Sequence, residues 1–263
     1  MPTVNDIIIE IEKIADPKYA YEWDNCGLCA GDKKSIVKKV LITLDITKDV
    51  VIEAINKGCQ MIISHHPLIF KPVLTVNTDT YAGEVLSLLY KNNIALYCAH
   101  TSLDIAVNGV NEALCKKLQL KNVSLLAPFI IDGTKLSCAR TGEIEKTLNK
   151  NQLIQYVKEK IGAKVLNYNL EDKMYKKIAL STGAGEDFAF DITDEDVFIT
   201  GEIKYHTALE LKRKNVSFIV AGHYYTEIHY IEDFMACLQK AVNVLQYNVT
   251  FLKSETNTNP FEN

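Results

Sequence analysis

The stretch of sequence that decides the fold is MIISHHP, at residues 61–67. Its apolar run, Met61 to Ile63, is followed at once by a serine and two histidines. A short apolar run bounded by polar residues is typical of a strand buried on both faces, as in a parallel sheet. Pro67 stops the chain from continuing regularly past the histidines. The stretch therefore predicts a buried strand whose carboxyl end carries two imidazoles.

Strand and helix patterns alternate on both sides of this stretch. Residues 39–44 and 94–98 read as strands, and residues 47–56 and 82–90 read as helices. This alternation is typical of the α/β class, with mostly parallel sheets. The other expected elements are helices at 5–14, 111–118, 152–160, 205–213 and 226–238, and strands at 135–140, 165–169, 177–181, 197–200, 217–220 and 244–251.

Turn-forming residues near the middle of the chain indicate a domain boundary. Ala127-Pro128 and Asp132-Gly133 are both strong turn signals. We therefore expect a first α/β domain over residues 1–126 and a second α/β region over residues 127–263. The last elements of the second region could pack back on the first domain.

Composition narrows the class of protein. The chain has 263 residues, of which 48% are hydrophobic and 24% charged, so it can bury a substantial core. No apolar run reaches the ~18 residues that could span a bilayer. The formal net charge of −4 argues against a sequence-independent nucleic-acid binder. The amino terminus lacks the basic and apolar regions of an export signal, which predicts a cytoplasmic protein.

The seven cysteines are best interpreted as thiols. Their odd number and scattered positions do not describe a disulfide framework. Cys26 and Cys29 form the one Cys-x-x-Cys spacing, which could be redox-active or half of a zinc site. No second pair or neighbouring histidine completes either arrangement, so packed thiols are the favoured interpretation.

Two further strand-like runs end in a histidine that is followed four residues later by a carboxylate. His100 and Asp104 form one such pair, and His223 and Glu227 form the other. Gly222 permits a sharp turn before His223, and a helix from there would place His223 and Glu227 on one face. Ligands of open α/β sheets gather at these carboxyl ends of strands.

Taken singly, each of these histidines is more often an ordinary hydrogen-bonded residue than a metal ligand. Their coincidence at three strand ends favours a metal site. Imidazole and carboxylate ligands of this number suit two divalent ions that share a bridging carboxylate. The candidate metal ligands are His65, His66, Asp104, His223 and Glu227.

Two small-residue turns follow other predicted strands. Thr200-Gly201-Glu202 precedes a helix start that also carries His206, and Glu202 and His206 are candidate catalytic residues for proton transfer. Ser181 to Gly185 could be an ordinary turn or a phosphate cradle, and it lacks the full dinucleotide fingerprint.

Several of these segments together resemble the GTP cyclohydrolase 1 type 2 homolog family, also called Nif-three-like proteins. The resemblance spans the whole chain and is carried by WDNCGL at 23–28, SHHPL at 64–68, AHTSLD at 99–104 with GVN at 109–111, TGE at 200–202 and GHYYTE at 222–227. It implies a Nif-three-like α/β fold, with two α/β domains whose mixed sheets flank a metal-binding cleft. It also implies a homohexameric ring, and the length is that of the short form without an inserted domain.

The same resemblance gives the five candidate ligands to a dinuclear metal centre, with Glu227 bridging. It leaves His100 without a ligand role but available to orient Asp104. The mixed ligand set suits Zn, Mn, Fe, Co or Ni. The box that contains Cys26 and Cys29 is expected to support the fold or the cleft rather than redox chemistry.

These observations predict a metal-dependent hydrolase, in which two ions activate a water for attack on a small-molecule substrate that could be nucleotide-like. Nothing in the sequence is specific for guanine, so the substrate stays unassigned. The alternative is a non-catalytic ring that binds metal or ligand for regulation or as a scaffold. A role in threading nucleic acid is disfavoured by the acidic charge, although Lys212 to Lys214 could form a local basic surface. No membrane partner is expected.

Overall fold

The computed structural model describes residues 1–262, which form two compact units. Unit 1 comprises residues 1–106 together with the C-terminal segment from Ile231, and unit 2 comprises Val107–Tyr230. The division therefore falls after Ala106 rather than after residue 126, and the C-terminal segment belongs with unit 1. The C-terminal strand adds to the unit 1 sheet, and the helix after residue 109 packs in the core of unit 2.

A mostly parallel sheet forms the centre of unit 1. Its strands run in the order β1-β4-β3-β2-β13, and β4, β3, β2 and β13 are parallel neighbours. β1 pairs with β4 in the antiparallel direction. The buried strand predicted from MIISHHP is confirmed as β3. The strand bounds are β1 Gly27–Ala30, β2 Lys39–Thr43, β3 Met61–Ser64, β4 Ala95–Cys98 and β13 Thr250–Lys253.

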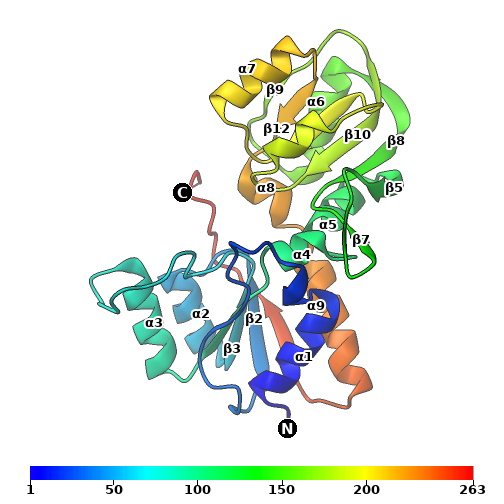
Figure 1. The fold of residues 1–263 in the computed structure, drawn as a ribbon. Helices are drawn as coiled ribbons and strands as arrows, with labels where there is room; N and C mark the ends of the chain where they lie inside the picture. The colour runs from blue at the N-terminus through cyan, green and yellow to red at the C-terminus, as the bar shows by residue number, and fades with distance from the viewer. Residues whose placement is uncertain (263) are drawn as a thin grey trace. The chain divides into compact units, whose positions relative to one another are not determined.

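Helices cover both faces of this sheet (Figure 1), with α2 and α3 on one side and α1 and α9 on the other. Side chains alternate between the faces of a strand. Leu41, Ile62 and Leu96, on neighbouring strands, share one apolar core with α2 and α3. The helix bounds are α1 Val4–Ile14, α2 Lys48–Lys57, α3 Tyr81–Lys91, α4 Thr101–Ile105 and α9 Tyr230–Val244, with a 3-10 turn, η1, at Pro17–Tyr19.

Glu53 of α2 attaches the C-terminal segment to unit 1. Its carboxylate accepts hydrogen bonds from the hydroxyls of Ser254 and Thr256, both at 2.6 Å, and pairs with Lys57 at 2.8 Å. Burial raises the pKa of Glu53, but these interactions outweigh burial and lower the pKa to about 2. The segment after β13 is therefore held in place by the ionised carboxylate of Glu53 in α2.

Unit 2 is built on a mixed sheet of order β5-β8-β10-β11-β12-β9. Its centre, β10-β11-β12, is parallel, and β8 and β9 flank that centre as antiparallel strands. A separate hairpin, β6-β7, turns at Asp132-Gly133, where both residues have positive φ as a tight hairpin turn requires. The strand bounds are β5 Lys121–Leu125, β6 Phe129–Ile131, β7 Thr134–Leu136, β8 Arg140–Asn149, β9 Asn167–Asn169, β10 Met174–Ser181, β11 Val197–Thr200 and β12 Phe218–Val220.

The unit 2 sheet is also covered on both faces. Ile178 and Leu180 of β10 pack with α5 and α6, whereas Ala179 lies in a second core with Leu211 of α7. The helix bounds are α5 Val110–Lys117, α6 Lys150–Ile161, α7 Tyr205–Arg213 and α8 His223–Glu227, with a 3-10 turn, η2, at Glu186–Phe190. These units confirm the predicted α/β class.

Several boundaries differ from the sequence prediction. The strand expected at 135–140 is divided between β7 and the start of β8, and the helix expected at 226–238 is divided between α8 and α9. The last strand occupies Thr250–Lys253 rather than 244–251, because α9 continues to Val244. Periodicity over a few residues does not separate the end of an amphipathic helix from the start of a strand, because both contain spaced apolar residues.

Among residues 1–262, no helix combines the length and the apolar character needed to cross a membrane.

Candidate metal centre

Three histidines lie together at the carboxyl ends of two parallel strands of the unit 1 sheet. His65 and His66 follow β3 and His100 follows β4, and these parallel strands end in register, with Ser64 opposite Cys98. One ring nitrogen of each histidine lies within 4.8 Å of a ring nitrogen of the other two. We call this group, His65, His66 and His100, the three-histidine cluster. Its spacing is compatible with imidazoles that share a divalent ion.

In both His65 and His66, the ring nitrogen Nδ1 lies at hydrogen-bond distance from an oxygen atom. His65 Nδ1 lies 2.8 Å from the carbonyl oxygen of Ala99, and His66 Nδ1 lies 2.7 Å from Asp45 Oδ1. A carbonyl oxygen only accepts hydrogen bonds, so His65 Nδ1 carries the proton. Nε2 is then the nitrogen available to a metal, which is the usual arrangement for a metal-binding histidine.

The carboxylate of Asp24 holds the ring nitrogen Nδ1 of His100. Its Oδ1 lies 2.8 Å from His100 Nδ1, and its Oδ2 accepts hydrogen bonds from the backbone N–H (3.0 Å) and the hydroxyl (2.6 Å) of Thr101. Burial raises the pKa of Asp24, but the hydrogen bonds from His100 and Thr101 outweigh burial and hold the pKa well below its usual range. A buried, ionised carboxylate therefore orients His100.

Sequence reasoning missed this arrangement. It left His100 without a ligand role and did not identify Asp24 or Asp45 as partners of the cluster. Asp24 lies 76 residues from His100, and Asp45 lies 21 residues from His66. No short-range spacing connects these pairs. The antiparallel pairing of β1 with β4 brings Asp24 to His100, and the parallel pairing of β2 with β3 brings Asp45 to His66.

The predicted ligand Asp104 lies beside this cluster. It belongs to α4, and its Oδ1 is 3.6 Å from His65 Nε2. The Asp104 backbone N–H donates to the carbonyl of His100, so a helical turn directly after β4 sets the direction of the carboxylate. Within unit 1, the structure thus brings together three of the five predicted ligands, and their nitrogen and oxygen atoms fit a divalent transition metal.

In unit 2, His223 and Glu227 form the pair expected from their spacing. They occupy successive turns of α8, and His223 Nε2 lies 3.1 Å from Glu227 Oε2. The Glu227 side chain is buried, at 5% exposure. On the other side of the ring, His223 Nδ1 lies 2.9 Å from Glu202 Oε1. Glu202, predicted as a proton carrier, therefore contacts His223 directly and orients it as Asp45 orients His66.

Two glycines allow the strand ends to approach this pair. A Cβ atom on Gly183 would lie 2.2 Å from Glu227 Oε1, and Gly183 has a positive φ of 59°. A Cβ atom on Gly201 would lie 2.7 Å from the Gly183 carbonyl oxygen and 2.8 Å from His223 Cα. The small-residue turn at 181–185, which the sequence left open between two interpretations, thus fits closely against the Glu227 carboxylate.

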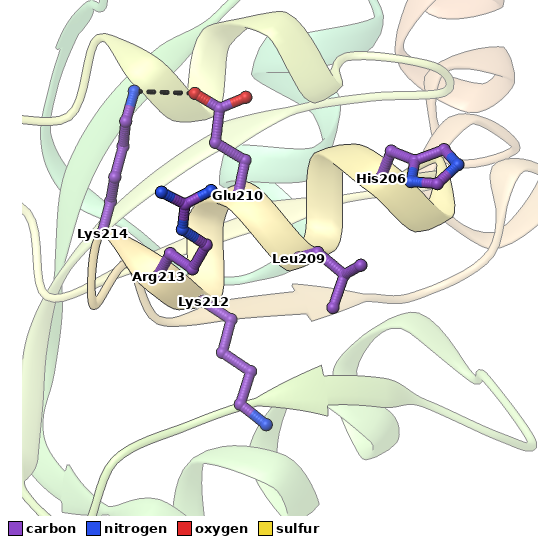
Figure 2. A pocket seen from close by; sticks show the side chains of 6 residues that line it. All are labelled: His206, Leu209, Glu210, Lys212, Arg213 and Lys214. Carbon is purple, nitrogen blue, oxygen red and sulfur yellow. Dashed lines mark ion pairs between the residues drawn. The ribbon is translucent and has the colours of Figure 1, made fainter.

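The second predicted proton carrier lies in a different group of residues. His206 is in the first turn of α7, and its ring faces Tyr205 at a centroid distance of 5.6 Å. Figure 2 shows it at the start of α7, and the other residues that line the same pocket follow along this helix to Lys214, directly after its end. The pocket has a volume of about 820 Å³. In this pocket Glu210 pairs with Lys214 at 3.1 Å. His206 is therefore grouped with the basic end of α7 rather than with Glu202 and His223.

Each unit is thus an α/β sheet whose parallel strands end in imidazoles and carboxylates, the residue types that hold divalent ions, which defines the class as an α/β protein with candidate metal-binding groups. Residues 2–260 match the family model described as Duf34/NIF3 (NGG1p interacting factor 3), and the chain belongs to this family.

Known proteins resemble this chain over nearly its whole length. It is 33% identical, over 262 residues and 98% of both chains, to a protein of Clostridium acetobutylicum named GTP cyclohydrolase 1 type 2 homolog. A Staphylococcus aureus hypothetical protein has a similar structure, with a TM-score of 0.93, 30% identity and coverage of 100% of both chains. A Bacillus cereus protein related to NIF3 has a TM-score of 0.94 at 24% identity, covering 100% of this chain and 99% of its own, which shows the shared fold. The family resemblance found in the sequence is confirmed.

Proposed function

We propose that this protein is a hydrolase that depends on a dinuclear divalent-metal centre. The proposed ligands are the five predicted from the sequence, His65, His66 and Asp104 of unit 1 and His223 and Glu227 of unit 2. His100 is a further proposed ligand, because one of its ring nitrogens lies within 4.8 Å of a ring nitrogen of His65 and of His66. The observation that carries the proposal is the three-histidine cluster, because its three rings lie close together and each Nδ1 is held by an oxygen, which is the usual arrangement of histidines that bind a metal through Nε2. The proposed ions are Zn, Mn, Fe, Co or Ni, two per chain.

Divalent ions bound there would act as Lewis acids and lower the pKa of a bound water enough to make hydroxide available at neutral pH. The residues of the chain supply orientation and charge. Asp45 and Glu202 hold the rings of His66 and His223 in fixed directions. The carboxylates of Asp104 and Glu227 would balance part of the charge of the ions.

Glu202 is the proposed proton carrier. Glu202 contacts His223, and 58% of its side chain is exposed, so it can exchange a proton with solvent. His206, the other residue predicted to transfer protons, lies with the basic end of α7, so the proposal gives it no part in the reaction. The substrate class is a small molecule with an electrophilic carbon or phosphorus.

The test is metal stoichiometry by elemental analysis. We would compare the wild-type protein with His65→Ala in unit 1 and Glu227→Ala in unit 2. His206→Ala is the matched control, because it removes an imidazole that is not a proposed ligand. The proposal expects close to two ions per chain in the wild-type protein and the control, and a sharp loss in both ligand variants.

Other results would contradict the proposal in different ways. Near-zero metal in all variants, even after reloading, would overturn the metal centre. Loss of metal in His65→Ala alone would show that unit 2 does not share the ions. Full metal occupancy without turnover of any phosphoester, amide or nucleotide substrate would leave the alternative, a non-catalytic metal-binding or scaffold ring.

We further propose that the chain assembles as a homohexameric ring, an assembly supported by the resemblance to Nif-three-like proteins. The molar mass in solution, measured by light scattering after size-exclusion chromatography, tests this directly. A monomer at working concentration would contradict it.

A further inference from the structure

An exposed aromatic group lies beside the three-histidine cluster. Tyr21 and Trp23 stack with ring centroids 5.5 Å apart and planes at 15°, and Phe70 lies 5.6 Å from Trp23 at 49°. Trp23 is 57% exposed and Phe70 is 51% exposed. We call Tyr21, Trp23 and Phe70 the aromatic platform. Large apolar rings held at the surface in this way need an explanation, because exposure leaves their hydrophobic area in water.

Hydrogen bonds fix the backbone around the aromatic platform. The Tyr21 backbone N–H donates to Thr101 Oγ1 at 3.1 Å, and Asp24 accepts two hydrogen bonds from Thr101. Asn25 Nδ2 donates to the Ile69 carbonyl at 2.6 Å, which ties the chain next to Trp23 to the chain next to Phe70. Hydrogen bonds therefore hold the chain within two residues of Trp23 and one residue of Phe70, so the platform is set before any ligand arrives.

The platform also adjoins the residues proposed to hold metal. The His100 ring lies 6.3 Å from Trp23 and 6.5 Å from Phe70, and it meets both nearly edge-on, at 71° and 74°. His100 in turn lies 5.1 Å from the His65 ring. A flat ring that packs on Trp23 would therefore lie near His100 of the three-histidine cluster.

We propose that the aromatic platform binds the planar heteroaromatic ring of a small-molecule substrate, which stacks on Trp23 and contacts Phe70 at its side. This proposal adds a substrate class to the proposed function at the same site. It rests on that function only for the reaction that follows binding. Tyr21 already shows that a ring stacks on Trp23 nearly parallel, and indole is a strong stacking partner for flat heterocycles. The formal charge of −4 favours a small ligand over a nucleic-acid strand.

The sequence contains one tryptophan, so its fluorescence reports this site directly. We would titrate zinc-loaded protein with guanosine, adenosine and, as a probe without a ring, tripolyphosphate, and correct the emission against free tryptophan. Saturable quenching by both nucleosides and none by tripolyphosphate is expected, because stacking does not distinguish bases by their edges. No saturable change with either nucleoside would overturn the proposal.

Variants locate the binding site on the platform. Phe70→Ala keeps the reporter and should weaken nucleoside binding about 5- to 100-fold, the range typical for loss of one stacking partner. The matched control is Leu74→Ala, an aliphatic side chain in the same loop that is 95% exposed, and its affinity should equal that of the wild type. Equal affinities in both variants would refute the role of Phe70 and hence the platform.

Further readouts separate the possible failures. Metal content is measured on the same samples. Absence of metal with unchanged quenching would contradict the proposed metal centre and support the aromatic platform as a separate binding site. An emission change that depends on protein concentration instead of ligand would show that a second copy of the chain covers the platform. A single-stranded oligonucleotide that binds far more tightly than the nucleosides would overturn the assignment to a small molecule.

Discussion

Replacing Asp24 by asparagine should both destabilise unit 1 and weaken metal binding. The Asp24 side chain is fully buried and accepts hydrogen bonds from His100, from the Thr101 backbone N–H and from the Thr101 hydroxyl. Asparagine has one acceptor oxygen in place of two and no charge. If that oxygen stays with His100, the amide group faces the Thr101 N–H, and two donors then oppose each other.

The magnitude follows from these contacts. A buried donor left without an acceptor costs about 1–3 kcal/mol, and loss of charge assistance in the His100 contact adds about 1 kcal/mol. We therefore expect Asp24→Asn to lower the free energy of unfolding by about 2–4 kcal/mol. Zinc affinity should fall about 10- to 100-fold, as is typical when the outer partner of a metal-binding histidine is removed.

The assay is urea unfolding of metal-free protein at neutral pH, together with zinc affinity from competition with a chelator. Asp172→Asn, which neutralises an exposed carboxylate in unit 2, is the matched control and should change neither quantity. If Asp24→Asn unfolds within about 0.5 kcal/mol of the wild type and binds zinc equally well, the assignment of Asp24 as the group that holds His100 is refuted.

Three further outcomes can be measured. Glu53→Gln should cost about 3 kcal/mol at pH 7, because a folded pKa of about 2 against an ordinary 4.5 gives stability that is present above pH 4.5 and lost as the pH falls towards 2; urea unfolding across this pH range should show the difference from the wild type closing in acid. Gly183→Ala should displace Glu227 and sharply reduce metal content, whereas Gly133→Ala, which has open space around its Cβ, should keep it. Phe198→Ala, at a fully buried position of unit 2, should lower the free energy of unfolding by about 3–5 kcal/mol in chemical denaturation, and an unchanged midpoint would contradict the packing described for that core.

Local sequence determined the elements and the chemical character of their ends. The apolar run before His65 is a buried strand because parallel strands covered on both faces need apolar side chains in both directions. The four-residue spacing of His223 and Glu227 placed them on one face of α8 because a helix repeats every 3.6 residues. Both inferences rest on local geometry, which the order of residues specifies.

The tertiary structure decided what those ends contact. Asp24 reaches His100 because β1 pairs with β4 in the antiparallel direction, and Asp45 reaches His66 because β2 and β3 are parallel neighbours. The same pairing assigned the C-terminal segment to unit 1, since β13 adds beside β2 and Glu53 holds the residues that follow it. These contacts join residues separated by 21 to 203 positions, and no periodicity within the sequence encodes such pairs.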